Sequence, residues 1–339
     1  MQQKMKLVSR RQSLAMLASA GLGMAWPAAS QVNASKSAVT VPLAQKLRIF
    51  IPANAGGGWD QTGRTLGAAL VDSGAAGEVQ YINQGGQGGT VGLATYVKDF
   101  SDDPNTLLIS GVVMLGALAR QSSPTYDLKD IQPLARLFND YLLVVVAGNS
   151  PIKTMRDLAQ LLREKTADTP IAGGSAGGID HIFAGGLVRV AKGQPEALNY
   201  QPFPGGVEVV KALVTGKAVV GISGYSEFSD DIASGKLRAI GVSSKRAMFG
   251  IPAVRELGLD VEMANWRAVM TGKNVAPPRR KEMEAALAQA LAHETWQKAL
   301  KANRWSSAWL AGDNFASFLD IETATTRLML YLLKLRASA

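Results

Sequence analysis

The sequence predicts an α/β protein with two domains of mixed sheet, joined by two crossing strands. Short apolar strands alternate with amphipathic helices along most of the 339 residues, and this alternation is typical of mostly parallel sheets covered by helices. Four times a strand leads into a glycine-rich turn and a helix start. Two longer apolar strands, 141–148 and 261–271, are placed to pass from one unit to the other. The domains predicted are therefore 31–142 plus 262–339, and 143–261.

The first thirty residues have the pattern of an export signal. Four basic residues and no acidic one precede or begin the apolar segment Leu14–Trp26, and the small residues Ala28-Ala29-Ser30 follow it. This order is typical of a secretory signal peptide, here expected at 1–30 and removed near residues 28–31. Because Arg10-Arg11 also resembles a twin-arginine signal, both export routes stay open. The apolar segment is shorter than the ~20 residues of a membrane span.

The two units are expected to contain the following elements. In the first unit, strands at 46–52, 79–83 and 106–110 alternate with helices that begin at Gln61 and Thr90. In the second, the amphipathic helix Met155–Lys165 is joined by strands at 171–172, 198–201, 219–223 and 237–243. Pro277-Pro278 marks a helix start, and the rest of the chain is expected to be helical, ending in a helix at 315–335.

Composition argues against several classes of function. The net charge is +9, but the predicted signal contributes four basic residues, which leaves a mildly basic remainder of 32 basic and 27 acidic residues. The short basic cluster at 279–281 has no interleaved aromatic residues, so nucleic-acid binding is not expected. The chain has no cysteine and no His-Glu-x-x-His motif, so we expect no metal site and no cofactor.

The glycine-rich turns are the strongest functional signal. They lie at 54–60, 84–89, 173–178 and 202–206. A helix N-terminus with free backbone N–H groups binds anions, and glycine lets a ligand approach that backbone. No Gly-Lys-Ser/Thr follows any of them, and Gln61 and Val91 stand where a dinucleotide fingerprint would need glycine. Four such turns favour a cleft for an anionic small molecule over glycines that only permit tight turns.

Three side chains in the first turn have predicted roles. Asp60 stands at a helix start, where a carboxylate accepts backbone N–H bonds and fixes the loop. Trp59 either walls the ligand cavity or packs in the core, and Arg64 pairs with Asp60 or faces the ligand.

The third turn also contains a Gly-x-Ser-x-Gly motif centred on Ser175, the pattern of a hydrolase nucleophile. The triad would need a histidine, and the chain has only His181 and His293. His181 lies too close in sequence for the usual arrangement, and His293 has the position of a surface residue. We therefore expect a binding protein without catalytic residues, with a secreted serine hydrolase as the alternative.

Together these segments resemble the periplasmic solute-binding receptors of tripartite tricarboxylate transporters. The resemblance covers nearly all of the mature chain and rests on Pro52–Arg64, Asn83–Gly92, Asp103–Leu108, Gly174–Gly178 with His181, Gly221–Phe228 and Gly235–Ile240. The Trp59–Thr62 segment is similar to the tricarboxylate-binding branch. Two departures flank the turns: Gln84–Gln87, where the family usually has Pro-Gly-Ala, and the additional prolines of 200–204.

The resemblance implies a type II periplasmic binding protein that closes two lobes on a carboxylate-bearing ligand, a tricarboxylate such as citrate or a dicarboxylate. It implies that the first-domain loops bind one carboxylate, mainly through backbone N–H groups and bridging waters. The second-domain loops would bind the rest of the ligand. The implied ligand-binding residues are Gly57, Gly58, Trp59, Asp60, Gly88, Gly89, Thr90, Ser175, Gly177, Gly178, His181, Gly205, Gly206, Ser223 and Tyr225.

The implied location is the periplasm, and the implied partners are the large and small membrane subunits of the transporter. We expect a monomer. A receptor that senses the ligand and signals to a membrane kinase would use the same closure and is a further alternative.

Overall fold

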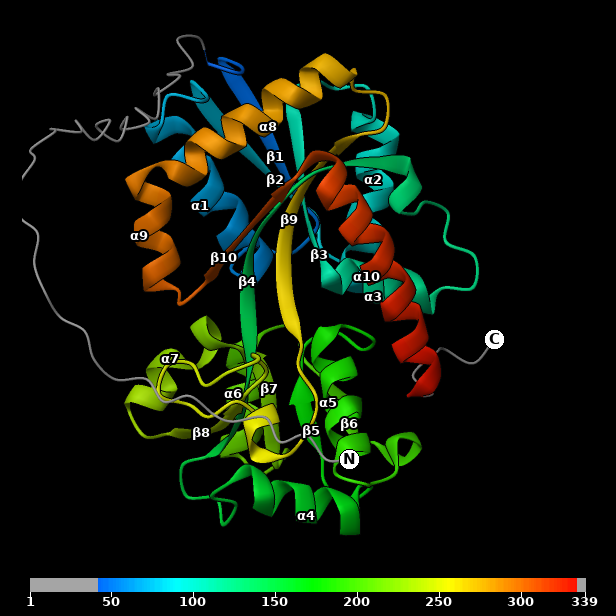
Figure 1. The fold of residues 1–339 in the computed structure, drawn as a ribbon, viewed down its shortest axis with the longest axis vertical. Coiled ribbons are helices and arrows are strands. Elements are labelled where there is room, and N and C mark those ends of the chain that lie inside the picture. The colour runs from blue at the N-terminus through cyan, green and yellow to red at the C-terminus, as the bar shows by residue number, and fades with distance from the viewer. Residues whose placement is uncertain (1–41, 334–339) are drawn as a thin grey trace, which may run out of the picture. The chain divides into compact units, whose positions relative to one another are not determined.

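The computed structural model describes residues 42–333, so the predicted signal peptide lies outside the described residues (Figure 1). The strands are β1 (Lys46–Ile51), β2 (Glu78–Asn83), β3 (Thr106–Gly111), β4 (Ile131–Ala147), β5 (Ile171–Gly173), β6 (Tyr200–Pro202), β7 (Val220–Gly224), β8 (Leu237–Val242), β9 (Ala264–Gly272) and β10 (Ser306–Ala311). The α-helices are α1 (Gly58–Asp72), α2 (Thr90–Phe100), α3 (Val112–Arg120), α4 (Met155–Lys165), α5 (Ile179–Val190), α6 (Gly206–Val214), α7 (Tyr225–Ala233), α8 (Pro277–Ala292), α9 (Glu294–Ala302) and α10 (Gly312–Leu332). Single 3-10 turns are η1 (Gln87–Gly89), η2 (Leu128–Asp130), η3 (Pro195–Ala197) and η4 (Arg255–Leu257).

The first lobe is built on one mixed sheet. Strands β2, β1 and β3 are parallel, as their intervening helices require, and β9 is antiparallel to both β3 and β4. Strand β10 adds to β4 on the other side. Every residue of β3 is buried, and Phe50 of β1 packs against the rings of Tyr96 and Phe100 from α2. Helices α1 and α8 contact each other, which places the C-terminal part of the chain back on this lobe (Figure 1).

The second lobe is a smaller mixed sheet. Strands β6, β5 and β7 are parallel, and β7 and β8 are each antiparallel to the last residues of β4. Strand β4 therefore belongs to both lobes: Ile131–Tyr141 pair with β9, and Leu142–Ala147 pair with β7 and β8. This is the first of the predicted crossing strands.

The chain returns beside β4 through a joint at Ser243. The Ser243 hydroxyl accepts a hydrogen bond from the Leu142 N–H (2.9 Å) and donates one to the Met263 carbonyl (2.6 Å). The Met263 N–H in turn donates to the Ser243 carbonyl. The outgoing and returning strands are thus tied together by one fully buried side chain.

The predicted fold class is confirmed, because this is an α/β fold of two mixed sheets that share β4. The second predicted crossing strand, 261–271, corresponds to β9, which starts at Ala264 and pairs only within the first sheet, so the chain returns between the lobes before this strand begins. Helix α4 has the predicted bounds, since Thr154 and Asp157 form a reciprocal capping box at its start. The prediction that everything after β9 is helical is wrong, because β10 lies between α9 and α10. The residue boundaries predicted for the domains stay a prediction. In residues 42–333 there is no helix with the length and apolarity that a membrane crossing requires.

Candidate ligand-binding site

The topology explains why the glycine-rich turns gather. Strands β1 and β2 are parallel neighbours, so the turns after Ile51 and Asn83 leave the same edge of the first sheet. Strands β5, β6 and β7 are likewise parallel, so the turns that follow them share one edge of the second sheet. Ligand sites in open α/β sheets lie outside the carboxyl ends of the strands, which is where these turns are.

A cleft of about 540 Å³ lies where turns of the two lobes face each other. The first lobe contributes η1 and the end of α3, and the second lobe contributes the turns after β5 and β6. The lining residues are Gln87, Gly88, Ala117, Arg120, Gln121, Ser175, Ala176, Pro202, Phe203 and Pro204. Among the described residues that line this cleft, Arg120 alone carries a charge. Six of the ten lining residues have no polar side chain, three offer an amide or a hydroxyl, and Arg120 supplies the one cation.

Asp60 fixes the first turn, as its position at the start of α1 predicts. Its carboxylate accepts hydrogen bonds from the Gly56 N–H, from Arg64 Nε and from Asn83 Nδ2, each at 2.9 Å. The Arg64 and Gly56 bonds lower the pKa of Asp60 although burial opposes them as the largest single effect. The side chain therefore ties the turn after β1 to the end of β2, and Arg64 pairs with it.

Trp59 is packed in the core beneath the second turn. Its side chain is buried, and Gly89 leaves so little room that a Cβ there would lie 2.5 Å from Trp59 Cζ3. Gly89 also has a φ of +94°, a conformation that favours glycine. No acceptor among residues 42–333 pairs with the buried Trp59 Nε1. The first two turns are thus held together by a tryptophan that has an unused N–H donor.

His181 and Asp180 shape the turn at 173–178. Asp180 accepts a hydrogen bond from the Gly174 N–H (2.7 Å), and His181 Nδ1 accepts one from the Gly177 N–H (2.9 Å). The His181 ring stacks on Tyr200 with a centroid distance of 4.1 Å. Burial, and to a smaller extent the charge of Arg120, lowers the pKa of His181 to about 4, so this ring is neutral at neutral pH.

Arg120 joins the two lobes and was not predicted from the sequence. It ends α3 in the first lobe, and its Nη1 donates to the Ala176 carbonyl in the second lobe (2.5 Å). Its side chain passes directly against Gly177, which has a φ of +79° and leaves space for it. The buried Arg120 Nε has no acceptor within the described part of the chain. The sequence pattern predicts a strand at 106–110 and names no helix after it, so it does not place Arg120 at the end of a helix.

A cluster of four charged side chains, three of them buried and Glu227 half-buried, lies behind the turns at the junction of the sheets. It consists of Asp140 on β4, Asp180 on α5, Glu227 on α7 and Arg267 on β9, and we call it the junction cluster. Asp140 is 5% exposed, Asp180 is 8% exposed and Arg267 is 7% exposed. Arg267 Nη1 donates to Asn265 (2.8 Å), and Ser223 donates to Glu227. Of these residues the sequence predicts a ligand-binding role only for Ser223, although Glu227 lies in the segment 221–228 that carries the family resemblance.

The junction cluster is electrostatically strained. Within residues 42–333 no carboxylate lies close enough to Arg267 for an ion pair shorter than 4 Å. Burial raises the pKa of Asp140 and of Asp180 to about 7, and the Arg267 charge only partly opposes this. Burial also lowers the pKa of Arg267. Three carboxylates, two of them buried, therefore share one buried guanidinium.

The structure distributes the predicted ligand-binding residues over this region unequally. Gly88 and Ser175 line the cleft. Thr90 bonds to the Gln87 carbonyl, and Gly205 and Gly206 begin α6 just after the cleft-lining Pro204. The rings of Tyr225 and Phe249, in the second lobe, pack against each other. The Arg304 guanidinium, from the first lobe, lies over both rings. Gly57, Gly58 and Gly178 stand at helix starts, so their role in binding stays a prediction.

Neither histidine is arranged to serve Ser175 as a catalytic base. His181 Nδ1 is bonded to the Gly177 N–H, and His293 caps α9 through Thr295. In the part of the chain that the structure describes, no hydrogen bond joins Ser175 to a histidine, and no group of acids and histidines could hold a metal.

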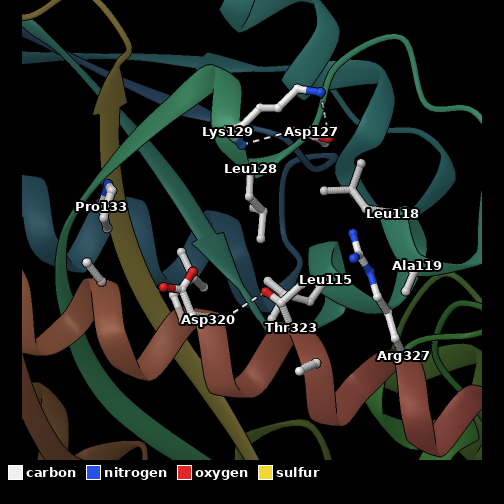
Figure 2. Close-up of a pocket in the computed structure, with 13 residues that line it drawn as sticks. Leu115, Leu118, Ala119, Asp127, Leu128, Lys129, Pro133, Asp320, Thr323 and Arg327 are labelled. Carbon is white, nitrogen blue, oxygen red and sulfur yellow. Dashed lines mark hydrogen bonds and ion pairs between the residues drawn. The ribbon is translucent and has the colours of Figure 1, made fainter.

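A second cavity, of about 480 Å³, lies between α3, η2 and α10 (Figure 2). Leu115 and Leu118 of α3 and Leu128 of η2 line it, with Lys129 and Asp127 at one end and Arg327 of α10 at the other (Figure 2). None of the glycine-rich turns lines it. It is therefore separate from the cleft to which the sequence pattern points.

Comparison with known proteins agrees with this architecture. A family profile described as the tripartite tricarboxylate transporter family receptor matches residues 75–327. The protein BugT of Bordetella pertussis is 28% identical over 256 residues, which cover 74% of this chain and 77% of BugT. The structure of the periplasmic binding protein BugD superposes with a TM-score of 0.77 at 18% identity, covering 88% of this chain and 100% of BugD. MatC of Rhodopseudomonas palustris with bound malate has a TM-score of 0.72 at 18% identity and covers 85% and 99%.

Proposed function

Because this chain belongs to the receptor family of tripartite tricarboxylate transporters, we propose that it captures an organic carboxylate in the periplasm. It then delivers the ligand to the large and small membrane subunits of such a transporter. The observation that carries the proposal is the cleft, where turns at the carboxyl ends of strands from both lobes meet around Arg120. A ligand held there contacts both lobes, so its binding favours the closed arrangement.

The proposed binding mode divides the ligand between the lobes. One carboxylate lies on the N–H groups of the turns around Gly57–Asp60 and Gly88–Thr90, at the starts of α1 and α2. The rest of the ligand lies against the second-lobe loops, where Ser175 offers a hydroxyl and Phe203 an apolar face. Arg120 supplies the charge that neutralises a further carboxylate, and its free Nε supports this role.

The proposed ligand class is a di- or tricarboxylate, with citrate and malate as the first candidates. Citrate follows from the similarity of Trp59–Thr62 to the tricarboxylate-binding branch. Malate is the ligand bound in the MatC structure, which shares the fold.

Titration calorimetry of the mature protein with citrate and with malate tests the proposal. We expect at least one of them to bind, and Arg120→Gln to weaken binding by about tenfold or more, since a charge-assisted hydrogen bond is worth about 1.5–3 kcal/mol. Lys281→Ala, on the exposed face of α8 where it pairs with Glu284, serves as the control and is expected to leave affinity unchanged. If no carboxylate bound to the folded wild type, the proposed function would be wrong.

Ser175 provides a smaller and separate prediction. Its side chain is exposed to the cleft, so Ser175→Ala is expected to lose one hydrogen bond and about 0.5–1.5 kcal/mol of binding free energy. The same calorimetry measures this loss. A wild-type esterase activity that disappeared in Ser175→Ala would instead favour the hydrolase alternative.

A further inference from the structure

Four of the glycine-rich or helix-start loops each contact one member of the junction cluster. In the first lobe, a Cβ at Gly58 would lie 3.1 Å from Arg267 Nη2. In the second lobe, the Gly174 N–H donates to Asp180, and Gly224 abuts Asp140. A Cβ at Gly206 would lie 2.6 Å from Glu227 Cβ. The loops that line or flank the cleft are therefore arranged around the junction cluster.

The charges of the junction cluster do not balance. With every group ionised, the carboxylates of Asp140, Asp180 and Glu227 face one guanidinium, which leaves an excess of two negative charges. One acceptor atom in the cluster is also unused, because no group in residues 42–333 donates a hydrogen bond to Asp140 Oδ1. Burying unpaired charge is costly, and a carboxylic acid avoids the cost by taking a proton.

We propose that the receptor takes up a proton at the junction cluster when an anion enters the cleft. This inference rests on the proposed function, because it needs a carboxylate ligand on the loops that contact the cluster. An anion placed there adds negative charge beside groups that already repel one another. The proton comes from solvent, binds a carboxylate oxygen of Asp140 or Asp180 and neutralises it.

The groups that face these two carboxyls support an uptake near neutral pH. Asp140 faces Arg267 from β9, Glu227 from α7 and the Tyr225 N–H. Asp180 faces the Gly174 N–H, Glu227, Arg267 and Asp140, with Tyr200 close by. The His181 ring stacked on Tyr200 is already neutral. The pKa of both acids is raised to about 7 before any ligand binds, and a nearby anion raises the pKa of an acid further.

The consequence is that affinity depends on pH. The folded-state pKa values of Asp140 and Asp180 lie above the value of about 3.9 in the unfolded chain. Below pH 7 these carboxyls are therefore largely protonated before any ligand binds, and above pH 7 they are largely ionised. Each proton taken up on binding makes affinity fall by about tenfold for each unit that the pH rises. Capture is therefore expected to tighten in mildly acidic surroundings.

The test counts protons by calorimetry of the full mature protein with malate at pH 7.5. Titrations in phosphate and in Tris, which differ in ionisation enthalpy, give the number of protons bound from the difference in heat. Malate is the probe because both its carboxyls are ionised at this pH, so the protein supplies any uptake. Citrate is titrated in parallel, so that binding is still detected if malate does not bind. In that case proton uptake is measured with citrate at pH 8, where the carboxyls of citrate itself are ionised.

We expect a net uptake of between about 0.5 and 1 proton in the wild type, and a smaller uptake in Asp140→Asn and in Asp180→Asn. Asp168→Asn, at an exposed turn after α4, is the matched control and keeps the full uptake. Heat that is independent of the buffer in the wild type overturns the coupling while leaving the proposed function intact. Absence of binding by both anions overturns the proposed function and the coupling with it.

Discussion

Replacing Gly57 by valine is expected to weaken carboxylate binding by about 100-fold while leaving the free energy of unfolding within about 1 kcal/mol of wild type. Gly57 has extended backbone angles that valine also adopts, and a Cβ there would meet only the Asn54 carbonyl, at 3.8 Å. We expect the added methyl groups to block a ligand's approach to the N–H groups at the start of α1, since the Cβ meets little else there. Calorimetry and urea unfolding on the same preparation measure the two quantities.

Gly89→Val is the contrasting control. There the new side chain would meet Trp59 at 2.5 Å, and the φ of +94° is unfavourable for a β-branched residue. We expect a loss of about 3 kcal/mol or more of stability, so a loss of binding in this variant has no value for locating the site. If Gly57→Val bound malate and citrate as tightly as wild type, the first-lobe turn would lie outside the ligand site.

Replacing Asp140 by asparagine is expected to stabilise the protein at pH 8, by about 2–4 kcal/mol, and to change little at pH 5. The pKa of Asp140 is raised to about 7 by burial, with repulsion from Glu227 adding to it. The folded protein therefore binds more protons than the unfolded chain between pH 4 and 7, and stability falls as the pH rises through this window. Asparagine removes the buried charge and still accepts the hydrogen bond from the Tyr225 N–H.

Urea unfolding at both pH values measures this effect, and Asp168→Asn is expected to show none of it. Asp60 and Asp103 act in the opposite sense, because their pKa values are lowered and their contribution is lost in acid. They are present in both proteins, so they cancel in the comparison. A variant less stable than wild type at pH 8 would mean that the Asp140 charge stabilises the fold through Arg267.

The parts of the fold that the sequence predicts are those with a local cause. The capping residues Thr154 and Asp157 define α4, and the glycine-rich turns mark where strands end. Helix α3 and strand β10 were missed for different reasons. Helix α3 is apolar almost throughout, and no polar residue caps its start. Because it directly follows the buried strand β3, hydrophobic periodicity does not show where the strand ends and the helix begins. Strand β10 owes its form to pairing with β4, more than 160 residues earlier in the chain.

The same distinction applies to the candidate site. Asp60 could be assigned from its position at a helix start, because its partners Gly56 and Arg64 are local. Arg120 and the junction cluster could not, since Asp140, Asp180, Glu227 and Arg267 come from four elements and meet only through the sheet topology. A single sequence carries no sign that these residues are neighbours.

The order in which strands appear along the chain has a consequence for folding kinetics. The central strand of the first sheet, β9, follows the whole second lobe, and it brings Met270 opposite Leu108. Closing so long a loop is entropically slow, and high contact order lowers folding rates. During synthesis, β1, β2 and β3 can pair early, but the first sheet is complete only after β9 has been made and pairs with β3.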